Sequence, residues 1–134
     1  MRDLEVVQRN FGDVTVLEIK GWINAAAYGH LTALLRELIA QGRSKFVFAF
    51  SEVRYVDSSG FAFPAAAYTA ARNSGGSVKL AETGKRMTDL LAITKLNTVF
   101  ETYERTEDAV RAFGADPDRP DGDPIVLGFA VERP

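Results

Sequence analysis

The fold is decided by a nearly continuous apolar run, Lys45-Phe46-Val47-Phe48-Ala49-Phe50, and by the polar tetrad that follows it, Asp57-Ser58-Ser59-Gly60. A short apolar run is typical of a strand at the centre of a sheet, where both faces are covered. Asp and Ser are common where a helix begins, because their side-chain oxygens accept hydrogen bonds from unpaired backbone N–H groups. An alanine-rich run over residues 61–71 follows the tetrad. The sequence therefore predicts a strand, a short loop and a helix that starts at the tetrad.

Two strands and a helix are expected before this unit. Residues 4–9 and 14–20 predict short strands, joined by a hairpin turn at Asn10-Phe11-Gly12-Asp13. Asn24 can cap a helix that runs to about Gln41, where Gly42 would stop it. The apolar face of that helix is formed by Ala27, Leu31, Leu34 and Leu38.

The helix after the tetrad should end near residues 73–76, and a strand is expected over residues 78–81. A third helix follows, and after it a fifth strand over residues 99–103. We expect a last helix over residues 107–113, capped by Thr106. The third helix should be lined by Met87, Leu90, Leu91 and Ile93. Strands that alternate with helices predict an α/β fold. We expect a mixed, mostly parallel sheet of about five strands that starts with an antiparallel hairpin, with about four helices.

The end of the chain differs in composition from the predicted domain, residues 1–113. Residues 114–124 are rich in Asp, Pro and Gly and predict a linker. Residues 125–134 form an apolar tail, in which Ile125, Leu127, Phe129 and Val131 alternate with smaller or less bulky residues. We hypothesise that this tail adds a strand to an exposed sheet edge or fills a groove, in its own subunit or in a homodimer mate. A disordered end is the alternative.

Composition excludes several classes of protein. The 134 residues suffice for one domain with its own core. Cysteine is absent, so the chain can form no disulfide, no catalytic thiol and no zinc–thiolate site. A sequence without cysteine fits a protein of a reducing cell interior. With a net charge of −2, the sequence does not show the excess of basic residues that binding to nucleic acid or anionic lipid requires. No apolar stretch approaches the roughly 20 residues of a membrane helix, and the N-terminus lacks a signal peptide's apolar segment. We expect a cytoplasmic protein that binds neither nucleic acid nor membrane.

The sequence also offers little for catalysis. His30 is the single histidine, and a lone helical histidine is usually a packing or surface residue. Ser58 lies beside Asp57 but outside a Gly-x-Ser-x-Gly pattern, so a hydrolase is only a minor alternative. Gly84-Lys85 is not part of a phosphate loop, and Gly75-Gly76 lacks the third glycine of a dinucleotide fingerprint. We therefore predict a protein that is not an enzyme and needs no cofactor or metal.

The tetrad is better suited to regulation by phosphorylation than to catalysis. A helix N-terminus is where negative charge is best tolerated, because its N–H groups and the helix dipole both point there. A phosphate on Ser58 would therefore be placed without unfolding its host.

The order of these elements and their motifs resembles the STAS domain, the sulphate transporter and anti-sigma factor antagonist family, over about residues 4–113. The most specific element is Val56-Asp57-Ser58-Ser59-Gly60, which matches the family's Asp-Ser-Ser/Thr-Gly phosphorylation motif. Weaker support comes from Gly21-Trp22-Ile23-Asn24, Gly75-Gly76 and the run from Leu90 to Leu96. Within the family, the chain is most similar to the small bacterial anti-sigma factor antagonists.

The resemblance implies a phosphorylation-switched binding module. Ser58 would be the phosphoacceptor, with Ser59 as the alternative. The partner would be an anti-sigma factor serine kinase, sequestered when the module is unphosphorylated, and a protein phosphatase 2C-type enzyme would reset the switch. Partner-binding residues would be Asn24, Asp57, Ser58, Ser59, Gly60 and Phe61. The alternative is a non-phosphorylated STAS scaffold subunit of a transporter or signalling assembly.

The chain departs from the family pattern after the motif. Pro64 falls within the predicted helix, where it removes one N–H group and crowds the carbonyl of Gly60. A loosened, displaced or kinked helix start is therefore expected. Asn24 stands where the family often has Asp, which keeps the cap but removes a charge.

Overall fold

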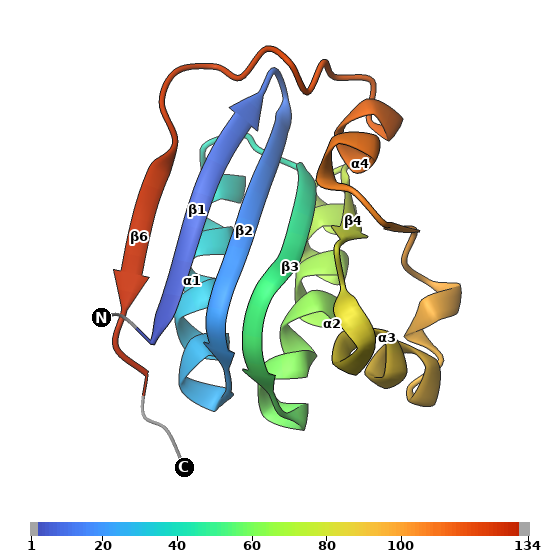
Figure 1. Cartoon of the computed structure of the whole chain (residues 1–134). Coiled ribbons are helices and arrows are strands. Elements are labelled where there is room, and N and C mark those ends of the chain that lie inside the picture. Colours follow the sequence, from blue (N-terminus) through green and yellow to red (C-terminus); the bar gives the residue numbers. More distant parts are fainter. Residues whose placement is uncertain (1–2, 132–134) are drawn as a thin grey trace.

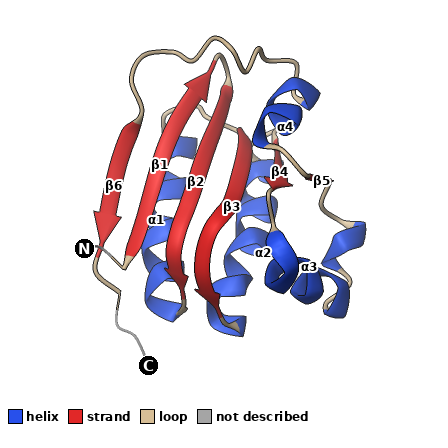
Figure 2. Ribbon diagram, in the orientation of Figure 1, coloured by secondary structure: helices blue, strands red, loops and turns tan. Residues whose placement is uncertain are grey.

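A computed structural model describes residues 3–131 of the chain. Within these residues, six strands form one mixed sheet in the order β5-β4-β3-β2-β1-β6, one strand more than predicted (Figures 1 and 2). The strands are β1 (Leu4–Phe11), β2 (Val14–Ile23), β3 (Lys45–Val56), β4 (Ser77–Ala81), β5 (Thr102–Tyr103) and β6 (Ile125–Phe129). The helices are α1 (Ala25–Ala40), α2 (Ser58–Asn73), α3 (Gly84–Ile93) and α4 (Thr106–Ala112), with a short 3-10 helix, η1 (Leu96–Thr98). The α/β class is confirmed.

The sheet begins with the predicted antiparallel hairpin and continues in parallel. β1 and β2 pair from Phe11↔Val14 outward, so the turn holds only Gly12 and Asp13. Gly12 has a φ of +61°, a left-handed conformation that glycine adopts without steric cost. β2, β3, β4 and β5 are parallel neighbours. β3 is longer than predicted and continues to Val56, although its last pair with β4 is Ala49↔Ala81.

The sheet is covered on both faces, as the apolar run in β3 predicted. On one face, α1 and α2 lie side by side behind the sheet in Figure 1, and the ring of Phe63 stacks on that of Phe48 with 5.0 Å between centroids. On the other face, α4 covers a smaller cluster. Its buried members are Phe11, Val14, Val16, Val47, Ala81, Ala109 and Val110.

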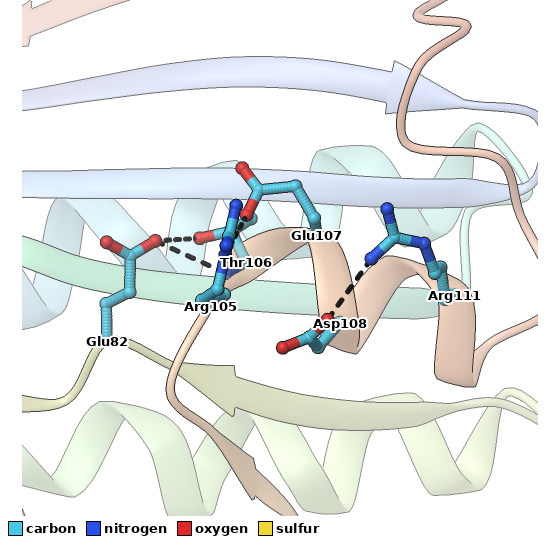
Figure 3. Close-up of polar contacts among 6 residues, drawn as sticks. All are labelled: Glu82, Arg105, Thr106, Glu107, Asp108 and Arg111. Atoms are coloured by element: carbon cyan, nitrogen blue, oxygen red, sulfur yellow. Dashed lines mark hydrogen bonds and ion pairs between the residues drawn. The ribbon is translucent and has the colours of Figure 1, made fainter.

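α4 is held at its first turn by a residue from a distant part of the chain (Figure 3). The Glu82 carboxylate, just after β4, accepts hydrogen bonds from the backbone N–H of Thr106 (3.3 Å) and from its hydroxyl. The prediction that Thr106 caps the helix is therefore wrong, because Thr106 is the first helical residue and Arg105 precedes it. Glu107 stabilises the positive end of the helix dipole.

The region after α3 differs most from the prediction. Lys95 adopts a left-handed φ of 61°, which ends the helical path and is followed by η1. The 3-10 turn carries the chain inward, so that Phe100 is buried in the core. The fifth strand is consequently only Thr102–Tyr103 instead of residues 99–103. Ile93 is 75% exposed and does not line the core face of α3.

The C-terminal tail forms β6 on the free edge of β1, in the same chain. The linker crosses over the end of the hairpin in Figure 1, and Asp121 fastens it there. Its N–H donates to the Asn10 carbonyl, and its carboxylate accepts from the Gly12 N–H, each at 2.8 Å. β6 then runs antiparallel to β1 from Ile125↔Gln8 to Phe129↔Leu4. A disordered end is thus wrong for residues 125–131, and a homodimer through the tail stays a prediction.

The inner face of β6 joins the main core. Leu127 and Phe129 pack against it, and Val131 is buried. The Phe129 ring stacks on His30 with 4.7 Å between centroids, so His30 is a packing residue, as expected. Residues 1–2 of the predicted domain and 132–134 of the predicted tail lie outside the described residues.

Candidate functional site

The first turn of α2 is fixed by the Asp57 side chain. One carboxylate oxygen, Oδ1, accepts a hydrogen bond from the Gly60 N–H at 2.9 Å, and the other lies 3.5 Å from the Tyr55 hydroxyl. The Asp57 carbonyl also accepts from the Phe61 N–H at 2.8 Å. The predicted helix start at the tetrad is confirmed, with Asp57 as its cap.

Pro64 does not displace the helix start. α2 is continuous from Ser58 to Asn73, with Pro64 buried inside it. The helix begins at Ser58, directly after Asp57, so the prediction of a displaced start is wrong, whereas a loosened or kinked start stays a prediction.

Ser58 and Ser59 are both exposed on this first turn. Among the described residues, neither hydroxyl has a hydrogen-bond partner. Each hydroxyl is therefore open to another protein. Their contacts do not separate the two serines, and the assignment to Ser58 stays a prediction from the motif.

The start of α1 is built in the same way and lies directly alongside. The Asn24 side chain accepts from the Ala27 N–H at 3.1 Å, which confirms Asn24 as the cap. The backbone N–H of Asp57 donates to the Ile23 carbonyl at 3.3 Å, so the two helix starts are joined. Gly60 allows this approach, because a Cβ added there would lie 1.9 Å from the Ile23 carbonyl oxygen.

The predicted site residues therefore divide into two layers. Ser58 and Ser59 lie at the surface, and Asp57 is half-buried. Asn24 is 6% exposed and Phe61 is 5% exposed, and Gly60 is also buried. Asn24, Gly60 and Phe61 therefore lie beneath the surface that Ser58 and Ser59 form, and their part in partner binding stays a prediction.

An aromatic pair borders the site and was not among the residues predicted from the sequence. The rings of Trp22 and Tyr55 stack across β2 and β3, with 4.5 Å between centroids and 28° between planes. Both side chains are half-buried. Trp22 lies two residues before Asn24 and Tyr55 two residues before Asp57, so equal spacing from the two caps was the available signal.

The part of the chain that the structure describes offers neither a group of side chains for a metal site nor a membrane-spanning helix. Residues 3–131 contain no group of three or more His, Asp or Glu side chains that could hold a metal ion. They also contain no helix long and apolar enough to cross a membrane.

Residues 5–109 match the family model of the STAS domain. The chain therefore belongs to the STAS domain family, as the motif around Ser58 indicated. No curated protein matches the chain at a significant level.

Solved structures of anti-sigma factor antagonists share this fold. One from Mycobacterium paratuberculosis is 21% identical with a TM-score of 0.71, and the match covers 80% of this chain and 91% of that one. The phosphorylated form of SpoIIAA, a Bacillus cell fate determinant, is 17% identical with a TM-score of 0.66, covering 80% and 98%. A sulfate transporter family protein from Wolinella succinogenes is 15% identical with a TM-score of 0.66, covering 75% and 84%. At these identities the likeness extends to the fold alone.

Proposed function

We propose that this chain is an anti-sigma factor antagonist switched by phosphorylation of Ser58. In its unphosphorylated form it sequesters an anti-sigma factor serine kinase and thereby frees a sigma factor. The observation that carries the proposal is the exposed Ser58 hydroxyl, on a capped helix start within a matching STAS motif. The chain acts as a binding module, and ATP is the substrate of its partner.

The physical effect of the phosphate favours such a switch. Phosphorylation adds a charge of about −1.5 to −2 and three acceptor oxygens. The start of α2 tolerates this charge through its N–H groups and the helix dipole, so the domain stays folded. On a docking surface, the same group opposes binding by repulsion and by the cost of its desolvation. A protein phosphatase 2C-type enzyme would restore the binding form.

Incubation with candidate anti-sigma factor kinases and ATP, followed by mass spectrometry, tests the assignment. We expect one phosphate on wild type and on Ser59→Ala, and none on Ser58→Ala. Ser58→Ala should bind the kinase constitutively, and Ser58→Asp should bind at least about tenfold more weakly, or 1.4 kcal/mol. Ser74→Asp is the matched control, since Ser74 is exposed at the opposite end of α2.

Two outcomes would contradict the proposal. Complete phosphorylation of Ser58→Ala on Ser59 would move the switch to the neighbouring residue. An unmodified chain that instead co-purifies with transporter or signalling subunits would identify the non-phosphorylated scaffold, the alternative within this family.

A further inference from the structure

A groove opens beside the candidate site because β3 outlasts its neighbour β4. The last β3–β4 pair is Ala49↔Ala81, and residues 50–56 continue past it toward α2. α3 begins at Gly84 alongside this overhang. The space between them is a groove of about 170 Å³, here called the basic groove. Its polar and aromatic lining includes Ser51, Arg54, Tyr55, Thr83, Lys85 and Arg86.

The lining of the basic groove carries more positive than negative charge. Arg54 and Arg86 are exposed, and within the described residues neither has an ion-pair partner. Lys85 is paired with Asp89 at 2.9 Å. Glu82 is the carboxylate of the lining; its donors, the N–H and hydroxyl of Thr106, are neutral, so its negative charge offsets part of the charge of the arginines (Figure 3). Two unpaired arginines are thus concentrated at one rim of a chain whose net charge is −2.

Tyr55 makes the basic groove continuous with the candidate site. It lines the groove, its ring stacks on Trp22, and its hydroxyl lies 3.5 Å from the Asp57 carboxylate that caps α2. Trp, Tyr and Arg are the residue types most enriched among those that dominate binding energy at protein interfaces. The surface from Arg86 to Ser58 therefore has both the chemistry and the continuity of one docking face.

We propose that the basic groove binds an acidic segment of the protein partner, with Arg54 and Arg86 pairing with its carboxylates and Tyr55 packing against it. Arginine suits this role because its planar guanidinium forms two parallel hydrogen bonds with a carboxylate. The partner's identity as an anti-sigma factor kinase rests on the proposed function. The acidic chemistry of the segment rests on the groove itself.

The groove can be tested without the partner, by NMR titration of the labelled chain with an eight-residue glutamate-rich peptide at low ionic strength. Glutamine in place of glutamate gives a neutral control peptide. We expect shifts around residues 51–56 and 83–87 that only the acidic peptide causes and that salt suppresses. Arg54→Glu/Arg86→Glu should remove them, while Arg36→Glu/Arg72→Glu, which changes two exposed arginines elsewhere, should not. Shifts that are absent, or that persist in the groove variant, would overturn the inference.

Association with the kinase gives the second readout, followed by the fluorescence of Trp22, the single tryptophan. At low salt, Arg54→Glu/Arg86→Glu should lower the association rate constant tenfold or more and flatten its salt dependence. The Arg36/Arg72 control should keep most of the wild-type rate and slope. If the groove variant associates like wild type while Ser58→Asp still blocks binding, only the groove inference fails. If Ser58→Asp binds like wild type, the proposed switch fails instead.

Discussion

Substitution of Gly60 by Ala should destabilise the domain by forcing its two helix starts apart. A Cβ at this position would lie 1.9 Å from the Ile23 carbonyl oxygen and 2.8 Å from the backbone N of Asn24. Ordinary contact begins at 3.4 Å, so the first turn of α2 must move by about 1.5 Å. Both obstructing atoms belong to the backbone, and neither can rotate away.

The size of the effect follows from two opposing terms. Overpacking of this kind costs about 1–3 kcal/mol, and a clash with backbone belongs at the upper end of that range. The exchange of Gly for Ala within a helix returns about 0.5–1 kcal/mol. We therefore expect a net loss of about 2 kcal/mol. Gly29→Ala is the matched control, because Gly29 is exposed in α1 with nothing within 4 Å of the added Cβ. It should stabilise the chain by about 0.5–1 kcal/mol.

Urea denaturation followed by circular dichroism measures both variants against wild type. The midpoint should fall for Gly60→Ala and rise for Gly29→Ala, with the slope m unchanged in each. Because the same chemical change is made in two helices, propensity alone predicts shifts of the same sign. Equal shifts would refute the close approach between α2 and Ile23.

Two further changes test other parts of the fold. Phe129→Ala should lower the free energy of unfolding by about 2 kcal/mol, because its ring packs on His30 and the core. Val126→Ala, at a position 61% exposed, should change it by less than about 0.5 kcal/mol. Equal effects of the two substitutions in thermal melts would contradict the pairing of β6 with β1. Hydrogen bonds from Lys79 and then Tyr103 lower the pKa of Glu101, so its stabilising contribution is present at neutral pH and is lost as the pH falls below about 4. Glu101→Gln should therefore cost about 0.5 kcal/mol at pH 7 and nothing near pH 2, and a difference that is constant with pH would contradict this.

The features that could be predicted from the sequence are those whose causes are local. Asn24 and Asp57 each accept a hydrogen bond from an N–H three residues ahead, so the cap and the helix start lie in one short stretch. The hairpin turn and the apolar run of β3 are equally local signals. Their order along the chain was sufficient to predict the sheet class and to place both caps at the carboxyl ends of parallel strands.

The features that escaped prediction depend on contacts between distant residues. Glu82 holds Thr106 across 24 positions, and nothing near Thr106 indicates that its hydroxyl is engaged. The burial of Asn24 follows from the approach of α2 to Ile23, which no pattern around Asn24 reveals. The basic groove arises because β3 extends past β4, a difference between two strands that neither strand shows alone.

Charge alone accounts for how phosphorylation would end the complex. In the unphosphorylated chain, the unpaired Arg54 and Arg86 balance the charges of Glu82 and Asp57 on the docking face, and the two arginines attract an acidic segment locally. A phosphate on Ser58 brings about −1.5 to −2 to the same face and makes its total charge negative. The attraction that drives association is removed, and the acidic partner now meets a like charge next to Asp57. Because the helix start tolerates the phosphate, no rearrangement of the fold is needed, and removal of the phosphate restores the original surface.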